Sequence, residues 1–166
     1  MLNKELKWLS GFDWQKVVDI NRELCQKEGV VYKEGKGYEN ARQLWMENQD
    51  KPMKLIDALD FCKRLTAIEP FDFLNNNTFA SVAKAFISDK LNNAPKLPLT
   101  MLLNTASHYI VGNAKRREVL EVIGYFEYAT GDGEFKPASQ DTVKINQSES
   151  TGSTTRESKP ANVPVR

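Results

Sequence analysis

Apolar residues recur at every third or fourth position through most of the chain, from Leu2 to the neighbourhood of Gly131. This period matches the roughly 3.6 residues of a helical turn and predicts helices that each bury one side. Segment 75–91 is the clearest case, because further helices are predicted on both sides of it. We therefore expect it to be the central helix of the core, with these residues on its buried face: Phe79, Val82, Ala83, Phe86 and Leu91.

The same pattern predicts further helices, whose ends are marked by residues that cap or interrupt a helix. The expected ranges are a short helix over 2–9 and longer ones over 14–28, 38–48, 52–68, 100–111 and 114–130. Asp13 is a predicted N-cap, because its carboxylate can accept hydrogen bonds from the first turn. Gly29 suits the left-handed residue that closes a helix, and Pro52 suits a first turn. Asn21 interrupts the apolar face of the 14–28 helix.

Boundaries in the second half of the chain depend on a few residues. Asn75 is the predicted N-cap of the central helix. Two prolines within 92–99 predict a loop, after which Thr100 caps the next helix. Gly112 followed by Asn113 predicts a break between two helices. One helix running through Gly112 is the alternative, because a glycine inside a helix costs about 1 kcal/mol.

Two stretches depart from the helical pattern. Residues 30–38, VVYKEGKGY, combine two glycines with charged, β-branched and aromatic residues, which predicts a loop or a short extended pair. From Gly131 onward the chain is rich in Ser, Thr, Gly and Pro, and it cannot bury enough apolar surface to offset the entropy of ordering. We therefore predict an all-α fold, a compact bundle of five to six helices over residues 1–130, with a disordered C-terminal tail over 131–166.

The composition narrows the classes of protein that fit this fold. The chain has 166 residues, 40% of them hydrophobic, and a net charge of +1, which indicates one domain without the basic excess of a general nucleic-acid binder. Cys25 and Cys62 lie on predicted apolar faces, so we expect two buried, reduced thiols. The sequence shows no signal peptide and no window with the roughly 18 apolar residues of a membrane span. We expect a cytoplasmic protein without membrane contact.

No arrangement of residues in the sequence predicts catalysis, a metal site or a cofactor. His108 is the single histidine, and neither a second histidine nor a CxxC pair accompanies it. Asp57 and Asp60 share a helix face, but basic residues three and four positions away are spaced to pair with them in solvent. Gly35 and Gly37 belong to no phosphate-binding motif. We expect a non-enzymatic chain.

A cluster of three cations, Lys115, Arg116 and Arg117, lies in the first turn of the last predicted helix. Cations at a helix N-terminus oppose the helix dipole, and a cluster of this kind can bind phosphate. Glu118 and Glu121 are spaced to pair with Lys115 and Arg117, however, so a solvated surface with ion pairs is the alternative.

In the glycine-rich loop, a second basic group interleaves two rings with two cations: Tyr32, Lys33, Lys36 and Tyr38. Aromatic rings between cations can stack the bases of single-stranded nucleic acid. The same residues also fit a polar loop whose tyrosines pack against the core. Together the two basic groups make a nucleic-acid-associated protein the second hypothesis for function.

The leading hypothesis rests on Phe71 and Phe73, because the segment that carries them is unusually apolar for a loop. Apolar groups that cluster on a surface often mark a protein interface. A polar tail on a small helical domain also fits a component of a larger assembly. We therefore expect a helical binding or adaptor subunit that contacts a protein partner or a second copy of itself through these rings.

Overall fold

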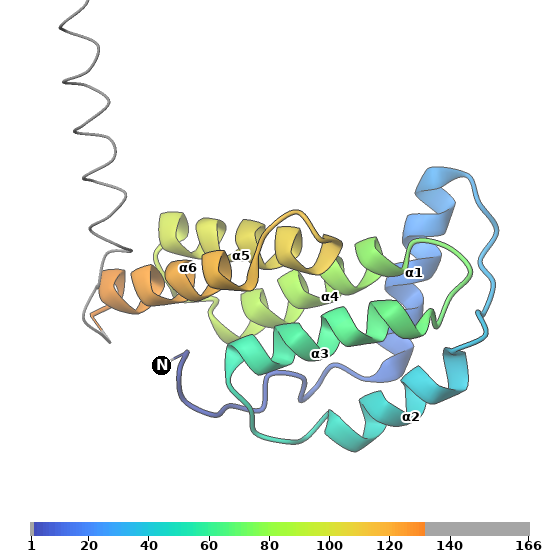
Figure 1. Cartoon of the computed structure of the whole chain (residues 1–166), viewed down its shortest axis with the longest axis horizontal. Coiled ribbons are helices and arrows are strands. Elements are labelled where there is room, and N and C mark those ends of the chain that lie inside the picture. The colour runs from blue at the N-terminus through green and yellow to red at the C-terminus, as the bar shows by residue number, and fades with distance from the viewer. Residues whose placement is uncertain (1, 132–166) are drawn as a thin grey trace, which may run out of the picture. The chain divides into compact units, whose positions relative to one another are not determined.

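The computed structural model of the chain describes residues 2–131 (Figure 1). Over these residues the chain forms six α-helices and no strand. The helices are α1 (Trp14–Glu28), α2 (Tyr38–Asn48), α3 (Leu55–Ile68), α4 (Asn75–Lys90), α5 (Lys96–Val111) and α6 (Arg116–Ala129). The prediction of an all-α bundle with five to six helices is confirmed. The predicted disordered tail lies outside the described residues, apart from Gly131.

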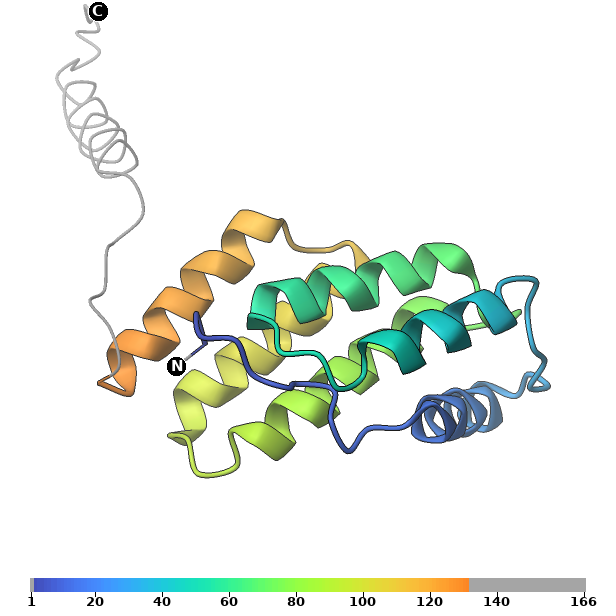
Figure 2. The ribbon, with the colours of Figure 1, turned by 90° about the horizontal axis from the view of Figure 1, so that it is seen from below.

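Helix α4 is central, as its periodicity predicted. It packs against α1, α3 and α5, whereas α6 packs against α5 and α2 packs against α1 and α3 (Figure 2). The opposite ends of the described chain therefore meet through a shared core around α4. Every residue predicted for the inner face of this helix is buried: Phe79, Val82, Ala83, Phe86 and Leu91.

The predicted short helix over 2–9 is wrong, because these residues run along the helices as an irregular segment. Leu6 forms an antiparallel bridge with Met53, in which each N–H donates to the other residue's carbonyl oxygen at 2.9 Å. Trp8 and Leu9 are fully buried against the body. So short a helix is only marginally stable by itself, and the contacts with Met53 satisfy the backbone instead.

Helices α3 and α5 begin at residues other than those predicted from the positions of the prolines. Helix α3 has Lys54 as its N-cap and starts after Pro52, because the bridge to Leu6 holds Met53 in an extended conformation. Helix α5 already starts at Lys96, and Pro98 lies in its first turn. A proline is tolerated there because the first N–H groups of a helix have no partner within the helix. Thr100 is therefore not a cap.

Two predicted N-caps are also wrong. Leu74 is the N-cap of α4, so Asn75 is its first helical residue. Lys115, not Asn113, is the N-cap of α6. The predicted break at Gly112 is confirmed, because this residue closes α5 in the left-handed region with a φ of 89°.

Other expected features of the first helices are confirmed. Asp13 accepts a hydrogen bond from the Lys16 N–H at 3.0 Å, and Gly29 closes α1 with a φ of 71°. Cys25 and Cys62 are both buried and form no disulfide. Burial raises the pKa of each thiol, so both stay protonated and act as small apolar groups.

Candidate functional site

Two loops lie side by side at the end of the bundle where α1 meets α2, and we call residues 30–37 and 69–74 the paired loops (Figures 1 and 2). Glu34 and Phe71 form an antiparallel bridge between them. The Gly35 N–H donates to the Pro70 carbonyl at 2.8 Å, and the Asp72 N–H donates to the Lys33 carbonyl at 3.0 Å. The predicted loop is confirmed for residues 30–37, but its one bridge joins it to the second loop and does not form an extended pair within 30–38.

The approach of the two backbones requires glycine at two positions. A Cβ atom on Gly35 would lie 2.5 Å from the Glu69 carbonyl oxygen, and one on Gly37 would lie 1.9 Å from the Ile68 carbonyl oxygen. Both contacts are with backbone atoms that side-chain motion cannot relieve. Gly35 and Gly37 therefore serve to join two loops closely, and this explains the glycine spacing that matched no phosphate-binding motif.

The 69–74 loop is held in a strained conformation. Glu69 and Leu74, at its two ends, have φ angles of 58° and 62°, in the left-handed region that favours glycine. The Asn75 side chain fixes the loop by accepting from the Phe71 N–H at 3.0 Å and donating to the Phe71 carbonyl at 2.7 Å. Strain of this kind costs on the order of 1–3 kcal/mol per residue and is often found at functional sites.

Phe71 is buried, with 1% of its surface exposed, so the expectation that it forms part of an exposed patch is wrong. Its ring stacks on Trp14 with centroids 6.1 Å apart and an interplanar angle of 8°. Tyr32 and Tyr38 complete the cluster at 5.9 Å and 6.1 Å. Phe71 therefore anchors the 69–74 loop to α1 and α2, and it is not accessible to a partner.

Phe73 is 46% exposed, in contrast to Phe71, and its backbone carbonyl is hydrogen-bonded to a buried side chain. The fully buried Asn21 side chain donates to the Phe73 carbonyl at 2.8 Å and to the Thr78 hydroxyl at 2.9 Å. Val31, on the neighbouring loop, is 81% exposed. Nothing in the sequence pattern selected Val31. The buried hydrogen bond to Phe73 had one sequence signal, the polar residue Asn21 on the apolar face of α1.

The predicted basic group of the 30–37 loop lies on the paired loops, with each member already in contact with another side chain. The Lys33 Nζ lies 3.4 Å from Asp72, and the Lys36 Nζ lies 3.0 Å from Glu69. The Tyr32 ring packs against Phe71 on one side, and the Arg22 guanidinium lies 4.4 Å from its centroid. The tyrosine packs against the core, so less of its ring is accessible for stacking on a base.

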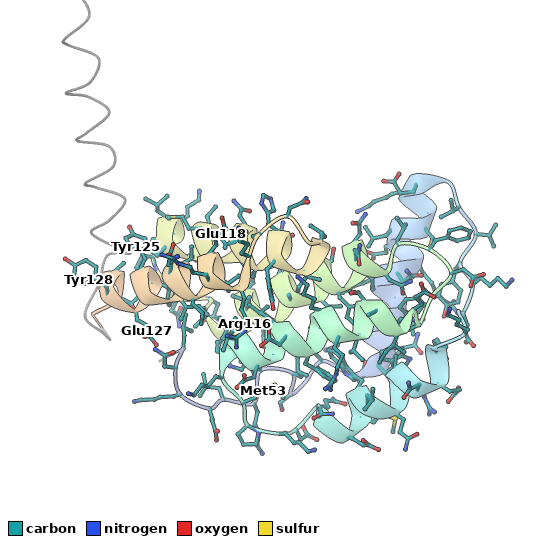
Figure 3. The ribbon with its side chains drawn as sticks, in the orientation of Figure 1. Met53, Arg116, Glu118, Tyr125, Glu127 and Tyr128 are labelled. Carbon is teal, nitrogen blue, oxygen red and sulfur yellow. The ribbon has the colours of Figure 1, made fainter. Side chains whose placement is uncertain are left out.

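Arg116, at the start of α6, lies beside α3 and apart from the paired loops (Figure 3). Arg116 donates to the Asp60 carboxylate at 3.1 Å, and Arg117 donates to Glu121 at 3.1 Å. The Lys115 N–H donates to the Glu118 carboxylate at 2.6 Å. The predicted ion pair is confirmed for Arg117 with Glu121, whereas Lys115 contacts Glu118 through its backbone N–H and Arg116 pairs with Asp60, which was not predicted.

Further titratable groups within residues 2–131 include His108, Asp60 and Tyr109. His108 is exposed, and no group of three or more histidine, cysteine or acidic residues there could hold a metal ion. Asp60 accepts a hydrogen bond of 2.5 Å from the Tyr109 hydroxyl in addition to the bond from Arg116. This contact ties α3 to α5 and α6. Burial, the hydrogen bond and the charge of Asp60 together raise the pKa of Tyr109 to about 12.

Comparisons with known proteins place no constraint on this site. No family model matches the chain, and neither a curated protein nor a solved structure matches it. Among the described residues, no helix has both the length and the apolar character needed to cross a membrane.

Proposed function

We propose that the chain is a non-enzymatic adaptor subunit that docks onto a protein partner through Phe73 and Val31 on the paired loops. The observation that carries the proposal is the contrast at Phe73. Its side chain is half exposed, while its carbonyl is bonded to Asn21, which has no exposed surface. A large apolar side chain is thereby presented to solvent from a fixed backbone.

A fixed backbone favours binding, because association then costs less conformational entropy. Gly35 and Gly37 allow the two loops to approach closely, Asn75 fixes the 69–74 loop, and the buried ring of Phe71 anchors that loop to the core. Aromatic residues that insert into a partner commonly carry a large share of the binding free energy. Phe73 has the exposure and chemistry of such an anchor, and Val31 is a second exposed apolar residue on the paired loops.

The test places a photo-crosslinking amino acid at Val31 and exposes the chain to an extract of its native source. Phe73→Ser is expected to reduce the yield of one specific crosslinked protein by at least about tenfold, since hot-spot changes cost about 2 kcal/mol or more. The matched control is Met46→Ser, because Met46 on α2 is also a large apolar residue with a similar exposed fraction, 57% against 46% for Phe73. It is expected to leave the crosslink unchanged.

The outcomes separate the two kinds of partner. A crosslink between two copies of the chain, lost in Phe73→Ser together with a larger mass in light scattering, would identify self-association. Equal crosslinking in wild type, Phe73→Ser and Met46→Ser would show that the paired loops are not the docking surface, and the proposal would then be abandoned.

The cytoplasmic setting is part of the same proposal. Two thiols that stay reduced, Cys25 and Cys62, are typical of a reducing compartment. Nucleic-acid binding through Lys115, Arg116 and Arg117 stays a prediction, and no contact among the described residues adds support to it. A nuclease-treated extract in the crosslinking experiment distinguishes a direct partner from one that is bridged by nucleic acid.

A further inference from the structure

The 30–37 loop has an outer edge with unused backbone groups. In an antiparallel pair, the backbone groups of successive residues point alternately toward the partner and away from it. Gly35 and Lys33 bond to the 69–74 loop through an N–H and a carbonyl, so the N–H and carbonyl of Glu34 point away from it. Because the Lys33 carbonyl points toward the 69–74 loop, the same alternation predicts that the backbone groups of Tyr32 also point away from it. Within the described chain, the backbone groups of Tyr32 and Glu34 form no hydrogen bond.

This edge is accessible and fixed in place. The 30–37 loop runs along the periphery of the helical body in both views, and the 69–74 loop lies on its inner side (Figures 1 and 2). Val31, Lys33 and Glu34 are exposed. The bridge between Glu34 and Phe71, with its two flanking backbone hydrogen bonds, holds the edge against the 69–74 loop. Unpaired N–H and carbonyl groups on a fixed extended segment form a template for another strand.

We infer that an extended segment of a partner protein pairs with Tyr32 and Glu34 as an added β-strand. The inference rests on the proposed function and specifies the class of partner. Backbone hydrogen bonds would supply part of the affinity, and side chains that reach Val31 and Phe73 would supply specificity. The segment must lack proline at the pairing positions, because proline has no N–H to donate.

A second copy of the chain fits this edge poorly. An antiparallel pair that uses both Tyr32 and Glu34 of two copies would place Lys33 directly opposite Lys33 of the other copy. Like charges directly opposite one another destabilise a strand pair. A different protein with an acidic residue opposite Lys33 and apolar residues toward Val31 matches the edge in charge and in character, and we commit to that occupant.

Two substitutions at Glu34 distinguish the contribution of its backbone N–H to binding from that of its side chain. Glu34→Pro removes the outward N–H without loss of an internal hydrogen bond, and the extended bridge is compatible with a following proline. Glu34→Ala keeps the N–H and removes the carboxylate. A phage-displayed library of random peptides, depleted on Glu34→Pro and then selected on the wild-type chain, supplies the probe.

Synthetic forms of the enriched peptides are expected to bind wild type and Glu34→Ala within about threefold of each other. They should bind Glu34→Pro at least about tenfold more weakly, because a hydrogen bond is lost and the ring blocks the approach of the added strand. Fluorescence anisotropy measures the three affinities, and circular dichroism confirms that all three chains are helical.

Hydrogen exchange provides a readout that needs no variant. On saturation with an enriched peptide, the amides of Tyr32 and Glu34 should gain protection, whereas the amide of Gly35 is already bonded internally and should change little. An empty selection, or peptides that bind all three chains equally, would overturn strand addition. Loss of the native crosslink in Phe73→Ser would still support docking at the paired loops, so the two failures are distinguishable.

Discussion

Phe71 and Phe73 lie two positions apart in one loop and have opposite environments. Phe71 is stacked on Trp14, whereas Phe73 faces solvent above the buried amide of Asn21. At the scale of single residues, the function of this loop depends on that division. One ring fixes the loop to the core, and the other is left for a partner.

The division predicts different energetic consequences for two similar substitutions. Phe71→Ala should lower the free energy of unfolding by about 3–5 kcal/mol, because it leaves a cavity under the aromatic cluster. Phe73→Ala should change it by less than about 0.5 kcal/mol, since its side chain is half exposed. Urea denaturation of both variants measures the difference. Equal losses in the two variants would mean that Phe73 also supports the core.

Tyr109 links three helices through Asp60, and this link has a defined dependence on pH. Its pKa is raised from 10 to about 12, so the folded state holds the hydroxyl proton more tightly than the unfolded state. The stabilisation is therefore complete below about pH 10 and is lost as the pH rises toward 12. Asp60 accepts from both Tyr109 and Arg116, so the hydroxyl bonds to a carboxylate that another side chain also holds.

Tyr109→Phe removes this hydroxyl and tests the link. At neutral pH the variant should be less stable by about 1.5–3 kcal/mol, the usual contribution of a hydrogen bond to a charged group. The gap between wild type and variant in urea denaturation should stay constant up to about pH 10 and shrink above it. A gap that is unchanged at alkaline pH would show that the hydroxyl does not titrate as the structure implies.

At the scale of elements, periodicity predicted which segments are helical, and it failed at several helix starts. The start of α3 is set by the bridge between Leu6 and Met53, a contact across 47 positions that local pattern cannot reveal. The start of α5 was misplaced because Pro98 was taken as a breaker, although a first turn accepts proline. Local rules succeed where the cap is a neighbouring residue, as at Asp13 and Gly112.

The candidate site was predicted less completely than the helices. The sequence indicated the apolar 71–73 segment and the polar 30–37 loop separately, but not that the two meet. Their contact depends on the close approach of Gly35 and Gly37 to backbone atoms of residues 68–71, which follow two helices later in the sequence. Residue type alone also could not predict which of Phe71 and Phe73 is buried, because the loop that carries both follows neither helical nor strand periodicity.

At the scale of the whole molecule, the two ends of the described chain are joined directly. Asn3 donates from its backbone N–H and its side-chain amide to the two oxygens of the Glu127 carboxylate, at 2.9 Å and 2.8 Å. The two residues are 124 positions apart, and Glu127 is buried in α6 on the side near the N-terminal segment (Figure 3). The irregular first segment thereby becomes part of the cooperative core.

Asn3→Ala tests whether this junction stabilises the whole fold. The substitution removes one hydrogen bond to a buried carboxylate and should lower the free energy of unfolding by about 1.5–3 kcal/mol. Asn92→Ala is the matched control, because Asn92 is exposed in the loop after α4 and forms no hydrogen bond among the described residues. It should change stability by less than about 0.5 kcal/mol.

Hydrogen exchange shows where the effect of Asn3→Ala is felt. If the first segment belongs to the cooperative unit, amides of the central helix α4 should lose protection together with those near Glu127, because all open in one global unfolding event. Lost protection confined to residues near Asn3 would instead describe a segment that detaches while the bundle stays folded. In that case the cooperative core would begin at α1, and the burial of Trp8 and Leu9 would contribute to local order rather than to global stability.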